Sequence, residues 1–165
     1  MSTKKTIIFH HLGFPIKLIS CPHILVEGEL VPDVDYEQLE ELMFRVLPLK
    51  PTRLTGAELK FIRHHLGKTQ AQFAKWLEDN VDDSSISKWE AQDLKPTGML
   101  DSMERSLRMQ LIVRGLKRQR RTTVPVMVME KVSASIATNR SDPLALKMPI
   151  PAKLPKDLLS AVALA

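Results

Sequence analysis

The sequence holds a single cysteine, Cys21, and no apolar run that approaches the length of a membrane helix. One cysteine excludes an internal disulfide and any zinc site built from several cysteines. A bilayer span needs about 20 consecutive apolar residues, so none is expected. The first residues carry two lysines and only a short apolar run, which makes a poor signal peptide. These absences predict a cytoplasmic protein with no membrane partner.

Catalytic and metal-binding patterns are also missing. His10 and His11 precede Cys21 and His23, but their spacing differs from that of a zinc finger, and the Cys-x-His pair is too tight for a usual tetrahedral site. Neither an orienting carboxylate nor an oxyanion device accompanies Cys21. We therefore expect no metal, no cofactor and no enzymatic activity.

Acidic residues are absent from one segment of a chain whose net charge is +5. Residues 1–50 and 51–104 each carry more acidic than basic side chains, whereas residues 105–121 carry seven basic and no acidic ones. Such a block indicates an anionic partner, although a solvated helix face is the common alternative. Charge alone therefore favours nucleic acid.

Residues 1–50 are typical of a small α+β region. Short β-favouring runs separated by Gly and Pro lie between residues 6 and 31, and predict two or three strands. Residues 32–49 predict a helix with acidic residues in its first turn. Its apolar face consists of Leu39, Leu42, Met43 and Val46.

Three short helices and a long one are predicted after residue 53. Thr55 with Glu58 forms a capping box for the first helix, Thr69 caps the second, and Asp82 or Asp83 caps the third. The long helix starts near residue 99 and extends to about 121. The expected inner residues of the second and third helices are Phe73, Ala74, Leu77, Ile86 and Trp89.

Closely spaced short helices with polar residues at the front of the third are typical of a helix-turn-helix. The small Ala74 would let two helices approach, while Ser84, Ser85 and Lys88 would face outward. Hydroxyl groups can contact base edges, and a lysine can reach the O6 or N7 atom of guanine. Gln70 begins the second helix and can contact a base edge or a phosphate.

The stretch "TQAQFAKWL…SSISKWE", preceded by "LTGAELKFIRHHLGK" and followed by "KP", resembles the Cro/CI-type (XRE, lambda-repressor-like) helix-turn-helix family over roughly residues 53–115. The resemblance implies a five-helix domain, here 53–116, that binds an operator in double-stranded DNA as a homodimer. The fold class is then mainly α, with a small α+β N-terminal extension and a partly disordered tail. The base readers are expected to be Gln70, Ser84, Ser85 and Lys88.

Phosphate contacts must come largely from outside the acidic core motif, because they dominate non-specific affinity. The backbone-contacting residues are expected to be Lys68, Thr69, Arg114, Lys117, Arg118, Arg120 and Arg121. One apolar stripe of the long helix serves either the core of the domain or a dimer interface, and the two uses can overlap. The stripe consists of Leu100, Met103, Leu107 and Leu111.

An α+β N-terminal piece followed by such a domain also resembles the MqsA-like antitoxin regulators, which repress their own operons in type II toxin–antitoxin modules. That resemblance implies a possible toxin partner for residues 1–50, but the cysteine pairs that bind zinc in that family are absent here. Residues 117–165 are expected to form a basic segment and a flexible tail.

The predicted function is therefore sequence-specific DNA binding by a dimeric autorepressor of the antitoxin type. Two alternatives remain open. The protein could activate transcription, or its helix-turn-helix could be a scaffold for protein interactions.

Overall fold

The computed structural model describes residues 4–77, 81–118, 126–138, 140–148 and 150, and shows a mixed α/β chain. The chain forms two compact units, and it passes between them after Val46 and again after Asp142. Unit 1 contains β1 (Lys4–Phe9), β2 (Ile16–Val26), β3 (Glu29–Pro32), α1 (Tyr36–Val46) and β4 (Leu144–Lys147). Unit 2 contains η1 (Leu47–Leu49), α2 (Gly56–His65), α3 (Gln70–Leu77), α4 (Asp83–Glu90), α5 (Asp101–Arg118) and α6 (Val126–Ile136).

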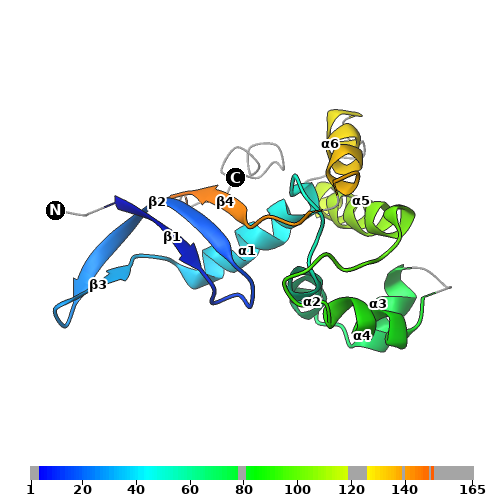
Figure 1. The fold of residues 1–165 in the computed structure, drawn as a ribbon, viewed down its shortest axis with the longest axis horizontal. Coiled ribbons are helices and arrows are strands. Elements are labelled where there is room, and N and C mark those ends of the chain that lie inside the picture. The colour runs from blue at the N-terminus through cyan, green and yellow to red at the C-terminus, as the bar shows by residue number, and fades with distance from the viewer. Residues whose placement is uncertain (1–3, 78–80, 119–125, 139, 149, 151–165) are drawn as a thin grey trace. The chain divides into compact units, whose positions relative to one another are not determined.

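Strand β2 is the centre of the sheet in unit 1 (Figure 1). It pairs antiparallel with β1 and β3, and parallel with β4. The pairing with β1 is interrupted by a bulge, where Ser20 takes a φ of 57°. One extra residue shifts the alternation of side chains. The buried positions of β2 therefore change from Ile16 and Leu18 to Cys21 and His23.

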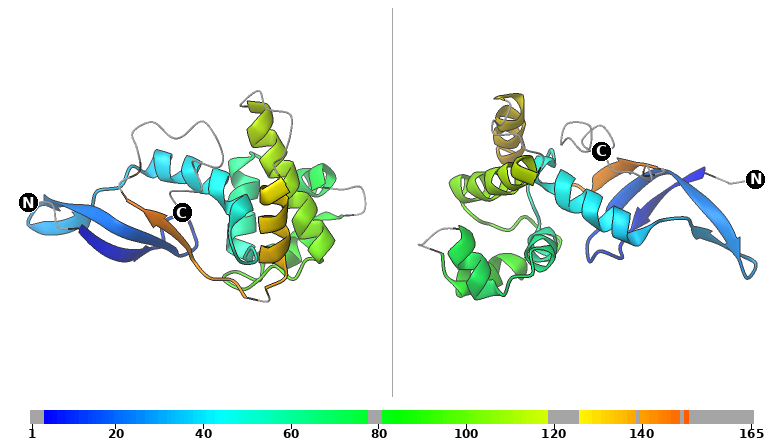
Figure 2. Two further views of the ribbon diagram at one scale, coloured as in Figure 1. Left: turned by 90° about the horizontal axis from the view of Figure 1, so that it is seen from above. Right: turned by 180° about the vertical axis from the view of Figure 1, so that it is seen from behind.

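Helix α1 lies over one face of this sheet (Figure 2). Its buried residues are the predicted stripe of Leu39, Leu42, Met43 and Val46, so that prediction is confirmed. The sheet contributes apolar side chains from distant parts of the sequence, including Phe9 in β1 and Leu146 in β4. The N-terminal strands are confirmed as well.

The segment predicted as a flexible tail is partly regular structure. Residues Val126–Ile136 form helix α6, which lies against α5 (Figure 2). Residues 144–147 form β4 and belong to unit 1. Residues 119–125 and 151–165 lie outside the described part of the chain. The three predicted segments, 1–50, 53–116 and 117–165, thus differ from the two units, because the chain returns to its first sheet.

Unit 2 contains a buried cluster of charged residues that the sequence did not predict. Lys50 donates from Nζ to both carboxylate oxygens of Glu58, at 2.8 and 2.9 Å. Arg108 is fully buried and donates to Glu104 Oε1 at 2.7 Å. The same guanidinium group donates to the carbonyl groups of Lys50 and Thr52, at 2.9 and 2.6 Å. Burial lowers the pKa of both Lys50 and Arg108, and the neighbouring carboxylates oppose that shift.

Replacing Arg108 with alanine should destabilise the protein by roughly 3–5 kcal/mol, because it leaves Glu104 charged and buried and two carbonyl groups without a donor. Urea unfolding followed by circular dichroism measures the change. Arg105→Ala is the matched control, since Arg105 lies on the same helix but is exposed. Equal effects of the two substitutions would contradict a structural role of the buried cluster.

Candidate functional site

Helices α2, α3 and α4 pack together in unit 2 (Figure 1). Thr55 and Glu58 form the predicted capping box at the start of α2. The predicted inner residues Phe73 and Ala74 of α3 and Ile86 of α4 are buried. Trp89 is partly buried. The buried Ile86 holds α4 against the rest of unit 2, and polar contacts also hold it there.

Glu90 joins the three helices through its carboxylate. Arg63 of α2 donates to both oxygens, from Nε at 2.6 Å and from Nη2 at 3.0 Å. Gln70 of α3 donates to Oε2 at 2.9 Å. Burial raises the pKa of Glu90, but the hydrogen bonds from Arg63 and Gln70 outweigh it and hold the pKa below its usual value. Glu90 therefore forms an internal ion pair with Arg63.

The start of α4 is held by a second carboxylate, that of Asp82. Its Oδ1 accepts from the backbone N–H of Ser85 at 2.8 Å and from Ser84 Oγ at 3.0 Å. Hydrogen bonds from the side chain and backbone of Ser85 lower the pKa of Asp82. Of the two predicted candidates, Asp82 is the N-cap of α4.

One face of α4 remains exposed, and it carries two of the four predicted base readers, Ser84 and Lys88. Ser87 lies on the same exposed face and was missed, although its spacing of three residues from Ser84 could have identified it. Ser85 is half-buried and takes part in capping. The amide nitrogen of Gln70 is engaged with Glu90. Ser85 and Gln70 therefore help to hold α4 in place.

The predicted phosphate-contacting residues are spread over unit 2. Thr69 is exposed and accepts from the N–H of Gln72 at 3.2 Å, so it caps α3 as predicted. Lys68 is half-buried, and Arg114 is exposed on α5. Lys117 and Arg118 belong to the last turn of α5, whereas Arg120 and Arg121 lie outside the described residues.

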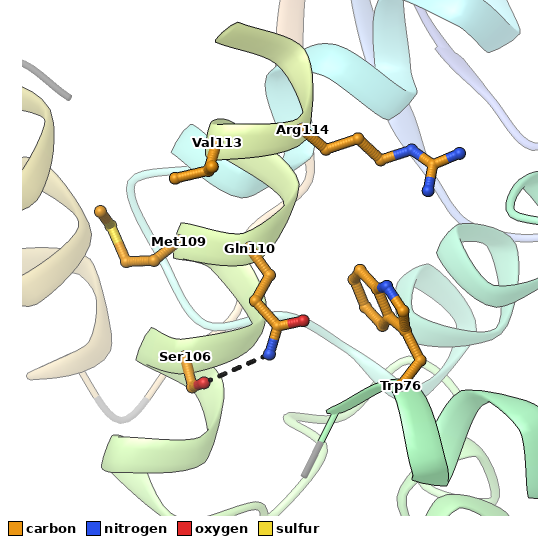
Figure 3. Close-up of a pocket in the computed structure, with 6 residues that line it drawn as sticks. All are labelled: Trp76, Ser106, Met109, Gln110, Val113 and Arg114. Atoms are coloured by element: carbon orange, nitrogen blue, oxygen red, sulfur yellow. Dashed lines mark hydrogen bonds between the residues drawn. The ribbon is translucent and has the colours of Figure 1, made fainter. Parts of the chain in front are cut away.

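Arg114 borders a groove between α3 and α5 with a volume of about 550 Å³ (Figure 3). Trp76 of α3 faces it from the opposite side, and Gln110 donates to the carbonyl of Leu77 at 3.0 Å across the helix pair. This hydrogen bond links α5 directly to the end of α3. The groove is lined by Trp76, Ser106, Met109, Gln110, Val113 and Arg114.

The predicted dimer stripe on α5 is divided between interior and surface. Leu107 and Leu111 are buried within unit 2, and Met103 is half-buried. Leu100 lies just before the first residue of α5 and is exposed. A partner could therefore contact only the start of this stripe, because packing inside the unit already uses the rest.

Among the described residues, no group of three His, Cys, Asp or Glu side chains is placed to hold a metal ion. Every described helix is too short or too polar to serve as a transmembrane span. Burial, followed by the charge of Asp33, raises the pKa of Cys21, which is the opposite of thiol activation. No family model, curated protein or solved structure matches this chain.

Replacing Gly56 with alanine tests the close approach of α2 to the end of α4. A Cβ atom at this position would lie 2.5 Å from the carbonyl oxygen of Trp89 and 2.7 Å from that of Glu90. The helices would have to separate, so we expect a loss of about 1–3 kcal/mol in the free energy of unfolding. In an unhindered helix, alanine would instead stabilise by roughly 0.5–1 kcal/mol. Thermal unfolding gives the sign, and stabilisation would contradict this packing.

The lowered pKa of Glu90 predicts acid sensitivity of the three-helix arrangement. Its contribution to stability is fully present above the ordinary carboxyl pKa of about 4.3 and is lost as the pH falls through the lower folded value. Urea midpoints at neutral pH and near pH 3 measure the loss. Glu90→Gln should be less stable at neutral pH and should lose less on acidification than the unmodified protein. An unchanged acid loss in this variant would contradict the assignment.

Proposed function

We propose that this protein is a sequence-specific DNA-binding regulator that acts as a homodimer and represses its own operon. The observation that carries the proposal is the set of contacts that hold α4 in place. Buried Ile86 and the carboxylates of Asp82 and Glu90 hold one side of the helix, while Ser84, Ser87 and Lys88 stay exposed on the other. A short, rigidly held helix with a polar outer face is what insertion into a major groove requires.

In this mechanism the outer face of α4 reads base edges, and basic residues elsewhere in unit 2 contact phosphates. Lys88 would donate to a guanine, and the serine hydroxyl groups would contact bases beside it. Arg114 supports the second role, because the groove and the Gln110–Leu77 hydrogen bond place its segment of α5 beside α3. A two-fold dimer would then bind half-sites about 10 base pairs apart. Binding at that spacing blocks a promoter without further chemistry.

A second function, protein docking through the helix-turn-helix, is favoured by one specific observation. The carboxylates of Asp82 and Asp83 stand exposed at the front of α4, where they would repel phosphates. Under this alternative the acidic end binds a basic protein surface and DNA plays no part. A promoter reporter distinguishes repression from activation by the sign of the response.

The deciding experiment combines Ser84→Ala with Lys88→Ala and measures fluorescence anisotropy with the DNA upstream of the gene and with scrambled DNA. We expect selectivity for the upstream DNA to fall about 10- to 100-fold, because each lost base contact contributes roughly 1–3 kcal/mol of discrimination. The salt dependence should change little, because the residues proposed to contact phosphates are unaltered.

The matched control combines Lys17→Ala with Ser133→Ala, which removes the same groups from exposed positions on β2 and α6. This control should keep full selectivity. Equal binding of the unmodified protein to both DNAs would reject the proposal and favour the docking alternative.

A further inference from the structure

The far end of β2 and the whole of β3 form a two-stranded ribbon, residues 23–32, that extends past the part of the sheet covered by α1 (Figure 1). A two-residue turn closes it, with Glu27 at a φ of 50° and Gly28 at 88°. Positive φ at both positions is the geometry of a tight type I′ hairpin, whose twist matches that of the strands. The ribbon is therefore a well-defined hairpin.

Both faces of this ribbon are apolar and exposed. Residues directly opposite one another share a face, so Ile24 and Val31 lie on one side, and Leu25 and Leu30 lie on the other. The exposed fractions are 47% for Ile24, 69% for Leu25, 45% for Val26 and 49% for Leu30. An isolated two-stranded hairpin is only marginally stable in water, and contiguous exposed apolar side chains indicate an interaction surface.

The two ends of the ribbon differ in net charge. Its tip carries Glu27 and Glu29, both exposed. Its base lies beside the exposed Lys4 and Lys5 of β1, which pair with Pro22 and Cys21. The exposed Asp33 lies there too and offsets one of the two positive charges, so the base keeps a net positive charge. The acidic and basic ends are thus separated by about four residues of strand, or roughly 13 Å.

We infer that this ribbon binds the ribbon of a second copy of the chain, packed antiparallel about a two-fold axis. In that arrangement the faces that carry Leu25 and Leu30 cover each other, and the acidic tip of each copy meets the lysines at the base of the other. Antiparallel packing makes the surface self-complementary, as a two-fold interface requires. Parallel packing would bring like charges together, and an anionic membrane surface would repel the tip. This inference and the proposed function both require a dimer and have nothing else in common. The dimer is tested without DNA.

The first test is the association state of the full chain, measured by sedimentation velocity between about 1 and 100 µM. The unmodified protein should dimerise, and Leu25→Ser combined with Leu30→Ser should weaken dimerisation at least tenfold. Both side chains are exposed, so the variant should keep its circular dichroism spectrum and thermal midpoint. Leu100→Ser is the matched control, because Leu100 is exposed by 74% beside the alternative interface on α5. That variant should dimerise normally.

The second test reverses the charges at the two ends. Glu27→Lys with Glu29→Lys makes tip and base both positive, and Lys4→Glu with Lys5→Glu makes both negative. Each variant alone should dimerise about tenfold more weakly, because like charges meet at both ends of the interface. An equimolar mixture should form a heterodimer as tight as the unmodified dimer, since both ends then carry opposite charges.

Three outcomes would overturn the inference. The first is a protein that stays monomeric at 100 µM, whether or not its ribbon binds neutral phosphatidylcholine vesicles. Another is a dimer that Leu100→Ser disrupts and the ribbon variant leaves intact, which would assign the interface to α5. The third is a dimer whose stability ignores both charge reversals and whose variants form no heterodimer. Loss of DNA selectivity in the Ser84/Lys88 variant with normal dimerisation would leave the inference intact.

Discussion

The buried ion pairs of Lys50 with Glu58 and of Arg108 with Glu104 determine how unit 2 is built. The segment between η1 and α2 runs through the interior without regular structure, so its carbonyl groups need donors from elsewhere. Arg108 supplies those donors, and Glu104 accepts from the N–H of Leu54 at 3.0 Å. Within these two pairs the cations balance the carboxylates, which makes their burial tolerable.

The packing of α2 against α4 depends on the same cluster. Glu58 accepts from Lys50 and, at 2.9 Å, from the N–H of Thr55, so one carboxylate both neutralises a buried cation and completes the capping box of α2. The first N–H groups of α2 donate to Lys95 and Asp93, which follow α4. Movement of the buried cluster would therefore shift α2, and with it Arg63 and the attachment of α4. The position of α4 thus depends on charges far from its outer face.

Residues that follow α6 contribute contacts to both units. Ser141 Oγ donates to the carbonyl of Arg53 at 2.6 Å and accepts from Lys50 at 2.8 Å. A few residues later, β4 pairs with β2 in unit 1. Truncation before residue 140 would therefore remove a strand from one unit and a hydrogen-bonding partner from the core of the other.

Features determined by neighbouring residues could be predicted from the sequence, and features determined by distant residues could not. The capping box at Thr55, the cap at Asp82 and the stripe of α1 follow from local spacing, and all three are confirmed. The pairing of β4 with β2 joins residues more than a hundred positions apart, and no local pattern in residues 122–148 indicates it. The outer face of α4 was predicted in part, since helical spacing gives Ser84 and Lys88. The sequence did not predict that Ser85 contacts Asp82 or that Gln70 contacts Glu90.

The basic block of residues 105–121 shows why charge composition alone overstates a phosphate-binding surface. Arg108 is one of its seven basic residues, yet it is buried and paired with Glu104 four residues earlier. It therefore adds nothing to counterion release, which counts only cations that can reach phosphates. Arg105 and Arg114 of the same helix are exposed and remain available. Under the proposed function, the salt dependence of DNA binding should therefore reflect only the exposed members of the block.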